Sequence, residues 1–165
     1  MMITGSVVKV GIADMNIAMN GSSIRTSGLG SCVGVVLYDE LIGLAGMVHV
    51  MLPYSSLGND QTLNLAKYAD TGIEELIRQL KNRGANLNRL QCKMAGGAQM
   101  FQFQSKSDVM RIGPRNAEAV RETLLKYKVP VVAEDIGGNK GRTIEFFTST
   151  RILQVRTVNE GTKEL

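Results

Sequence analysis

Hydrophobic residues in the first third of the chain form short runs that are bounded by glycine, proline and polar residues. Residues 7–13 are rich in β-branched side chains and predict a first strand, whereas the Gly, Ser and Asn residues within 16–23 predict a loop. The apolar runs 33–38 and 44–52 have the length of buried strands, and Pro53 ends the second run. Their closeness in the chain predicts a hairpin.

Two later segments repeat apolar residues at helical spacing. Between residues 62 and 83, apolar side chains recur at helical spacing with polar residues between them, and Gly84 follows as a stop signal. This segment therefore contains a predicted amphipathic helix. A second helix is predicted from Asn116, a residue type that favours the N-cap, to about Lys128. Pro130 closes that second helix.

Short apolar runs account for most of the remaining chain. They predict strands at residues 90–95, 129–134, 143–147 and 152–158. Residues 160–165 are expected to form a frayed tail. A chain of 165 residues has about the length of one domain, and it contains no internal repeat or linker. The pattern, taken with the family resemblance described below, predicts a single α+β domain over residues 1–165, a layered α/β sandwich with largely antiparallel or mixed sheets and two main amphipathic helices.

Composition places the chain among ordinary globular proteins, with 44% hydrophobic and 21% charged residues. No apolar stretch approaches the roughly 20 residues of a membrane helix, and residues 1–10 lack the pattern of a secretory signal. We therefore expect a cytoplasmic protein without direct membrane insertion. The formal charge of +4 suits an acidic partner surface, but basic clusters with interleaved aromatic residues are absent, so no nucleic-acid partner is expected.

The chain contains one histidine and two cysteines, and one cysteine stands in a distinctive setting. A symmetric hairpin centred between Glu40 and Leu41 would place Cys32 directly opposite His49, with Cβ atoms about 4.5–5.5 Å apart. An imidazole at that distance can lower the pKa of a thiol and hold it as the nucleophilic thiolate. The glycines and serines in residues 27–31 can bring backbone N–H groups close to a developing oxyanion. These features point to a cysteine nucleophile with a histidine base.

Plainer interpretations apply to the same residue types. A cysteine beside valine is often only buried packing, and a single histidine in a strand is more often a satisfied core residue than a catalyst. Cys92 is expected to be an inert buried thiol, and Asp39 a structural residue at the far end of the hairpin. One of Phe101 and Phe103 is expected to pack in the core, which leaves the other as a possible interface anchor. Neither the lone histidine nor the separated cysteines have zinc-ligand spacing, so no cofactor is expected.

Several collinear blocks of the sequence resemble the signature of the CheD family. These blocks are residues 26–33 (TSGLGSCV), 37–39 (LYD), 46–53 (GMVHVMLP), 67–70 (KYAD), 93–101 (KMAGGAQMF), 112–116 (IGPRN) and 134–142 (EDIGGNKGR). The resemblance runs from about residue 11 to residue 155. Because the blocks occur in the family's order, together they are far more specific than any one of them.

The resemblance implies a function that composition cannot supply. It implies a fold shared with cytotoxic necrotizing factor toxins, and a protein-glutamine deamidase that acts on the cytoplasmic helical domains of chemoreceptors, with the phosphatase CheC as a partner. The family's Cys, His and Thr triad falls on Cys32, His49 and Thr26. Thr26 would orient the imidazole, although Ser27 offers a neighbouring hydroxyl. Two alternatives stay open, a non-catalytic adaptor that binds receptors or CheC and a cysteine amidohydrolase or protease.

Overall fold

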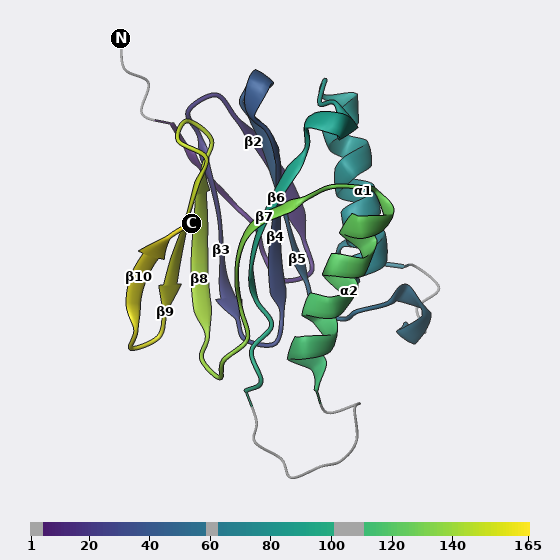
Figure 1. Ribbon diagram of the computed structural model, residues 1–165, viewed down its shortest axis with the longest axis vertical. Helices are drawn as coiled ribbons and strands as arrows, with labels where there is room; N and C mark the ends of the chain where they lie inside the picture. The colour runs from purple at the N-terminus through teal and green to yellow at the C-terminus, as the bar shows by residue number, and fades with distance from the viewer. Residues whose placement is uncertain (1–4, 59–62, 101–110) are drawn as a thin grey trace.

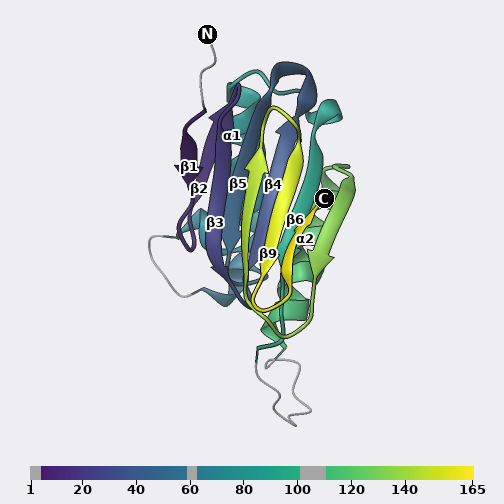
Figure 2. The ribbon, with the colours of Figure 1, turned by 90° about the vertical axis from the view of Figure 1, so that its left-hand side faces the viewer.

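Two mixed sheets and two helices stack in three layers in the computed structural model, which describes residues 5–58, 63–100 and 111–165 (Figure 1). Sheet A forms one outer layer, sheet B forms the middle layer, and helices α1 and α2 cover the other face of sheet B. The outward face of sheet A carries no helix (Figure 2). The predicted α+β class with mixed sheets and two main helices is confirmed. Phe101 and Phe103 lie outside the described residues.

Each sheet combines one parallel pair with antiparallel pairs. Sheet A has the strand order β1 (Val7–Lys9), β3 (Ser23–Leu29), β8 (Arg142–Phe147), β9 (Ile152–Thr157) and β10 (Gly161–Glu164), with β1 parallel to β3. Sheet B has the order β2 (Met15–Met19), β5 (Leu44–Val50), β4 (Val33–Asp39), β6 (Gln91–Gly96) and β7 (Val131–Ile136), with β6 parallel to β7. The central hairpin of the fold is therefore β4 and β5.

Strands β4 and β5 are buried along their whole length because sheet B is covered on both faces. Val33 and Val35 belong to the core beneath the helices, whereas Val36 packs into the core between the two sheets. This burial explains why both strands appear in the sequence as continuous apolar runs rather than alternating ones. The same double coverage makes the space between the sheets a second, separate core.

Helices α1 (Ala69–Asn82) and α2 (Ile112–Lys126) lie against sheet B and against each other. Helix α1 buries the apolar stripe that its periodicity predicts, including Ile73, Leu76 and Leu80. Four short 3₁₀ helices complete the described elements, namely η1 (Glu40–Ile42), η2 (Ser55–Leu57), η3 (Leu65–Lys67) and η4 (Leu87–Arg89). Among the described residues, no helix is both long and apolar enough to span a membrane.

Helix α1 lies within the segment 62–83 that was predicted to contain it, whereas α2 begins before its predicted start. The first begins at Ala69 because Tyr68 is extended and bridges Leu52, and the backbone N–H of Ala69 bonds to Leu52 O. The second begins at Ile112, four residues before the predicted cap, because Pro114 is tolerated within a first turn whose N–H groups lack intrahelical partners. Asn116 is therefore not an N-cap. It is a fully buried residue inside α2.

Two further expectations are wrong for the same reason. The predicted loop over residues 16–23 contains strand β2, and the predicted frayed tail over residues 160–165 contains strand β10. Both are short edge strands next to turn residues, and all four residues of β10 are exposed, so hydrophobic patterning alone does not identify them. Their pairing depends on backbone hydrogen bonds to β5 and β9, which side-chain patterns do not reveal.

Candidate active site

The candidate residues come from both sheets and meet at one end of the sandwich. Cys32 directly precedes β4, and His49 lies near the end of β5, so sheet B supplies both. Thr26 lies on β3 in sheet A. The β3–β4 connection, the end of β6 and the start of α2 lie at the same end of the molecule, the lower end in Figure 1. The site is thus built across the core between the sheets.

The hairpin register differs from the predicted one by two residues. His49 pairs with Gly34, and Val33 pairs with Val50, so Cys32 is not directly opposite His49. The difference arises because η1 and the left-handed Gly43 form a loop over residues 40–43, which centres the hairpin between Leu41 and Ile42, one residue later than predicted. Since side chains alternate faces with a period of two, a shift of two residues keeps Cys32 and His49 on the same face. They are diagonal neighbours, typically about 7–8 Å apart across strands.

A hydrogen bond links His49 to Thr26 across the two sheets. The distance from Thr26 Oγ1 to His49 Nδ1 is 2.7 Å, and the bond is buried. Thr26 Oγ1 also lies 2.8 Å from the carbonyl oxygen of Val10. Because that carbonyl can only accept, the Thr26 hydroxyl donates its single hydrogen to Val10 and must accept a hydrogen from Nδ1. This chain of two bonds assigns the hydrogen of neutral His49 to Nδ1.

The other ring nitrogen of His49 is left as a buried acceptor. In the neutral ring with hydrogen on Nδ1, Nε2 carries a lone pair. Neither Cys32 nor any other residue in the described ranges hydrogen-bonds to Nε2, although the His49 side chain is fully buried. A buried acceptor without a partner is uncommon and marks a position where a proton donor is expected. Its sheet neighbour Cys32 carries such a donor.

Gly34 leaves room for side chains of sheet A to approach β4 beside His49. It stands in the middle of an apolar strand, directly opposite His49. A Cβ atom added at Gly34 would lie 2.6 Å from Ile144 Cδ1 and 3.5 Å from Thr26 Cγ2. Any side chain here would therefore displace the residues that surround the His49–Thr26 pair. A glycine inside a strand can mark such a close approach, and that signal was available in the sequence.

The turn that carries Cys32 is held by the end of β6. Backbone N–H groups of Gly97 and Ala98 donate to the carbonyls of Cys32 and Gly30 at 2.9 and 2.8 Å. Gly96 has a φ of 119°, and a Cβ atom there would lie 2.2 Å from Cys32 O. Only glycine fits this approach. The glycine pair 96–97 thus fixes the backbone of the candidate nucleophile.

Burial sets the protonation states of the candidate pair. Burial lowers the pKa of His49 to about 4, so the ring is neutral near pH 7. Burial also raises the pKa of the Cys32 thiol, although a hydrogen bond from its own backbone N–H acts in the opposite direction. The resting pair is therefore a neutral thiol and a neutral imidazole. This differs from the thiolate that the sequence predicted, because desolvation disfavours both charged forms.

The sequence of the whole chain resembles proteins from several bacteria. The chain is 55% identical to the "Chemoreceptor glutamine deamidase CheD" of Halalkalibacterium halodurans, over 96% of this chain and 98% of the relative. It is 51% identical to the protein of that name from Bacillus subtilis, over 96% of each chain. The sequence profile described as "CheD chemotactic sensory transduction" matches residues 51–157. The chain belongs to the CheD family.

The CheD profile begins two residues after His49, so the three candidate residues lie outside the stretch that it matches. Among solved structures, the Bacillus licheniformis protein YfiH aligns with a TM-score of 0.47 and 14% identity, over 74% of this chain and 49% of that chain. The roles of Thr26, Cys32 and His49 in this CheD-family chain therefore depend on the geometry described above.

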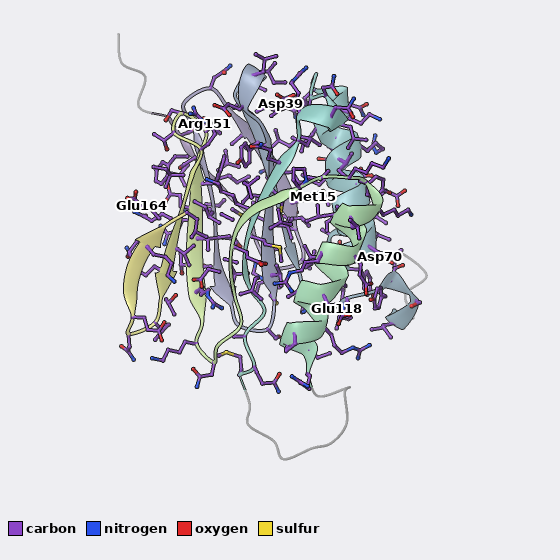
Figure 3. All side chains as sticks on the ribbon, in the orientation of Figure 1. Met15, Asp39, Asp70, Glu118, Arg151 and Glu164 are labelled. Atoms are coloured by element: carbon purple, nitrogen blue, oxygen red, sulfur yellow. The ribbon has the colours of Figure 1, made fainter. Side chains whose placement is uncertain are left out.

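Two other residues considered in the sequence lie away from the candidate site. Asp39 is at the opposite end of β4, near the upper end in Figure 3, where its carboxylate pairs with Arg89 at 2.9 Å. Its predicted structural role agrees with this position. Cys92 is fully buried in β6, and burial raises the pKa of its thiol. It has the environment expected of an inert thiol.

A cleft that contains two basic side chains adjoins Thr26 beside strands β1 and β3. The cleft has a volume of about 440 Å³ and is lined by Lys9, Val10, Gly11, Arg25, Thr26 and Ser27. Lys9 and Arg25 lie directly opposite each other on β1 and β3, and neither forms an ion pair within the described ranges. Two unpaired cations at adjacent positions favour an acidic partner surface. In the described part of the chain, no three His, Cys, Asp or Glu side chains are grouped to hold a metal ion.

The buried neutral His49 should make this CheD-family protein sensitive to acid. The unfolded chain protonates this histidine near pH 6.5, whereas the folded chain protonates it only near pH 4. Between these values the unfolded state binds more protons, so stability rises with pH and is lost as pH falls. From about pH 7 to about pH 4, wild type should lose on the order of 3 kcal/mol more unfolding free energy than His49→Gln.

Urea unfolding of both proteins at each pH measures this difference. Because the carboxylates are common to both proteins, their contribution cancels in the comparison. If wild type and His49→Gln lost equal amounts of unfolding free energy on acidification, that result would contradict a buried histidine with a lowered pKa.

Proposed function

We propose that this protein is a protein-glutamine deamidase that converts glutamine side chains of chemoreceptors to glutamate through a thioester on Cys32. The observation that carries the proposal is the buried Val10–Thr26–His49 hydrogen-bond chain, which leaves Nε2 as a free acceptor on the face that carries Cys32. The names of full-length relatives in the same family support the choice of substrate.

In the first half of the reaction, His49 acts as the base and then as the acid. Nε2 takes the thiol proton of Cys32 as the sulfur attacks the carboxamide carbon, so no thiolate has to persist in the resting enzyme. The backbone N–H of Cys32, which lies close enough to affect the pKa of its own sulfur, is the best placed donor for the oxyanion. The protonated imidazole then gives its proton to the departing ammonia. A thioester between Cys32 and the substrate remains.

In the second half, water replaces the sulfur. The neutral imidazole removes a proton from water, the resulting hydroxide attacks the thioester, and the thiolate leaves and is reprotonated by His49. The products are a glutamate side chain and ammonia, and the thiol is restored. Thr26 remains hydrogen-bonded to Nδ1 throughout, which keeps the hydrogen off Nε2 in the neutral ring.

The substrate in this proposal is supported by the names of the relatives, and the partner is carried over from the family resemblance of the sequence. The substrate glutamines lie in the helical cytoplasmic domains of chemoreceptors, which places the protein in the cytoplasm beside membrane receptors. The phosphatase CheC is proposed as a regulatory partner. The unpaired Lys9 and Arg25 beside Thr26 offer a surface that suits acidic groups around a substrate glutamine.

The proposal is tested with the wild-type protein and a purified chemoreceptor cytoplasmic fragment. Intact mass and peptide fragmentation should show glutamine converted to glutamate at particular positions, with one ammonia released for each conversion. A free glutamine or glutamine-containing short peptide should be converted far more slowly, because the substrate is a protein surface. Binding of the fragment without any conversion would support a non-catalytic adaptor instead.

Replacing Thr26 with valine should lower kcat for deamidation by roughly 10- to 100-fold. Valine keeps the shape of threonine, but it leaves Nδ1 of His49 and the carbonyl of Val10 without their buried partner. The ring can then carry its hydrogen on Nε2, which is the wrong nitrogen for accepting the thiol proton. Steady-state rates for the Thr26→Val and Thr26→Ser variants measure the effect, and serine should restore most of the rate. A Thr26→Val rate equal to that of wild type would show that the hydroxyl does not matter, and equal losses in both variants would show that the methyl group matters as well.

A further inference from the structure

Asn116 connects helix α2 to both strands that carry the candidate nucleophile and base. Its Nδ2 donates to the carbonyl of Ser31 at 3.0 Å and to the carbonyl of Met51 at 2.9 Å. Ser31 directly precedes Cys32, and Met51 follows His49 by two residues. A single amide group therefore bridges the two backbone segments at the open end of the β4–β5 hairpin.

The orientation of this amide is fixed by its partners. Both hydrogens of Nδ2 are used on carbonyl oxygens, so the flipped amide would place Oδ1 against two acceptors. Oδ1 has no hydrogen-bond partner within the described ranges, although Asn116 is fully buried. A buried unpaired acceptor is destabilising, because it has lost its hydrogen bonds to water without replacement. Asn116 is therefore a poor choice for stability alone, which favours a role in arranging its two partners.

Helix α2 is packed closely enough to hold these partners rigidly. A Cβ atom added at Gly113 would lie 2.1 Å from the carbonyl oxygen of Ala98, whose own N–H bonds to Gly30 O. The first turn of α2 thus contacts the same segment that supports the Cys32 turn from the β6 side. Asn116, one turn further along, contacts that turn and the end of β5 together.

We propose that Asn116 is a positioning residue that sets the separation between the Cys32 thiol and the His49 ring by holding the carbonyls of Ser31 and Met51. Cys32 and His49 are diagonal rather than direct neighbours, so β-sheet pairing does not fix their approach. Beyond Val33 and Val50, the last pair of β4 and β5, the bridge through Asn116 supplies the missing constraint. This inference rests on the proposed roles of Cys32 and His49.

The test uses alkylation of Cys32 by iodoacetamide, followed by peptide mass analysis, in the full chain without a receptor. Four proteins form a cycle: wild type, Asn116→Ala, His49→Gln and the double variant. When His49 is present, Asn116→Ala should slow alkylation of Cys32 about tenfold relative to wild type. When His49 is replaced by glutamine, adding Asn116→Ala should have no further effect. An equal slowing in both backgrounds, no slowing at all, or faster alkylation would overturn the proposal.

A matched control lies on the same helix. Thr123 is buried, and among the described residues its hydroxyl bonds only to Ala119 O within α2, so Thr123→Val should leave alkylation unchanged. Deamidation of a receptor fragment by Asn116→Ala should show a lower kcat, by roughly 10- to 100-fold, with KM unchanged. A raised KM with unchanged kcat would also overturn the positioning role. If wild type deamidates nothing, the alkylation cycle still tests positioning, so the two proposals fail separately.

The isosteric variant Asn116→Asp covers the case in which alanine prevents folding. An ionised carboxylate would face two carbonyl oxygens, whereas a protonated one can donate to one of them. The alkylation rate of this variant, divided by that of wild type at the same pH, should fall as pH rises from about 5 to about 8. A ratio that does not change with pH would count against the bridge.

Discussion

Replacing Cys32 with alanine should reduce receptor deamidation by about 10⁴-fold or more, because the reaction loses the atom that forms the thioester. The receptor fragment should keep its unmodified mass after incubation with Cys32→Ala under conditions in which wild type completes the conversion. The fold should tolerate the change, since Cys32 is only partly buried at the rim of the core between the sheets. Intact mass spectrometry of the receptor fragment measures the outcome.

Cys92 provides the matched control for this experiment. It is the second free thiol, it lies in the same sheet, and it is fully buried far along β6 from the Cys32 turn. Cys92→Ala should therefore retain the wild-type rate, apart from a modest loss of stability from the smaller side chain. Conversion by Cys32→Ala at a rate close to wild type would rule out the thioester mechanism. Loss of activity in both variants would indicate a general effect of cysteine removal on the fold.

Replacing His49 with glutamine should lower kcat by about 10³- to 10⁴-fold. Because the Cys32 thiol is neutral at rest and burial raises its pKa, attack on an amide needs a base that takes the proton during the reaction. His49 is the only histidine in the chain, so no other imidazole can replace it. Glutamine fills much of the same space and can keep a hydrogen bond to Thr26, which separates loss of the base from loss of packing.

The pH dependence of the rate distinguishes this mechanism from a preformed ion pair. The neutral His49 of wild type should keep the reaction active down to about pH 4–5, provided the fold survives. The residual rate of His49→Gln should instead rise with pH, as hydroxide or a spontaneously formed thiolate replaces the base. A His49→Gln variant within tenfold of wild type would show that the imidazole is not the base.

The hairpin shows how far sequence reasoning about the site extended. The run of apolar residues predicted both strands, and the face shared by Cys32 and His49 was right even though their direct pairing was wrong. Face parity survives any even shift in register, whereas the pairing partner depends on where the turn is centred. That centre was set by the 3₁₀ turn at Glu40–Ile42 and the left-handed Gly43, which hydrophobic patterning cannot reveal.

The residues that sequence reasoning missed act through the backbone or through distant contacts. The carbonyl of Val10 accepts from Thr26, and a backbone carbonyl has no residue-type signal. Asn116 looked like a helix cap because asparagine favours that position, but tertiary packing placed it inside a helix with partners 65 and 85 residues away. Local rules cannot anticipate contacts of that range.

The sequence alone determined the α+β class, the central strands, the family, and the identity of the one thiol and one imidazole that could form a pair. Those properties depend on local patterning and on residue types, which a single chain displays directly. Only the tertiary structure decided that Thr26 crosses from one sheet to the other to reach Nδ1, that Nε2 is left free, and that both partners are neutral. Tautomer and charge follow from burial and from long-range hydrogen bonds, because both depend on which groups the fold brings together.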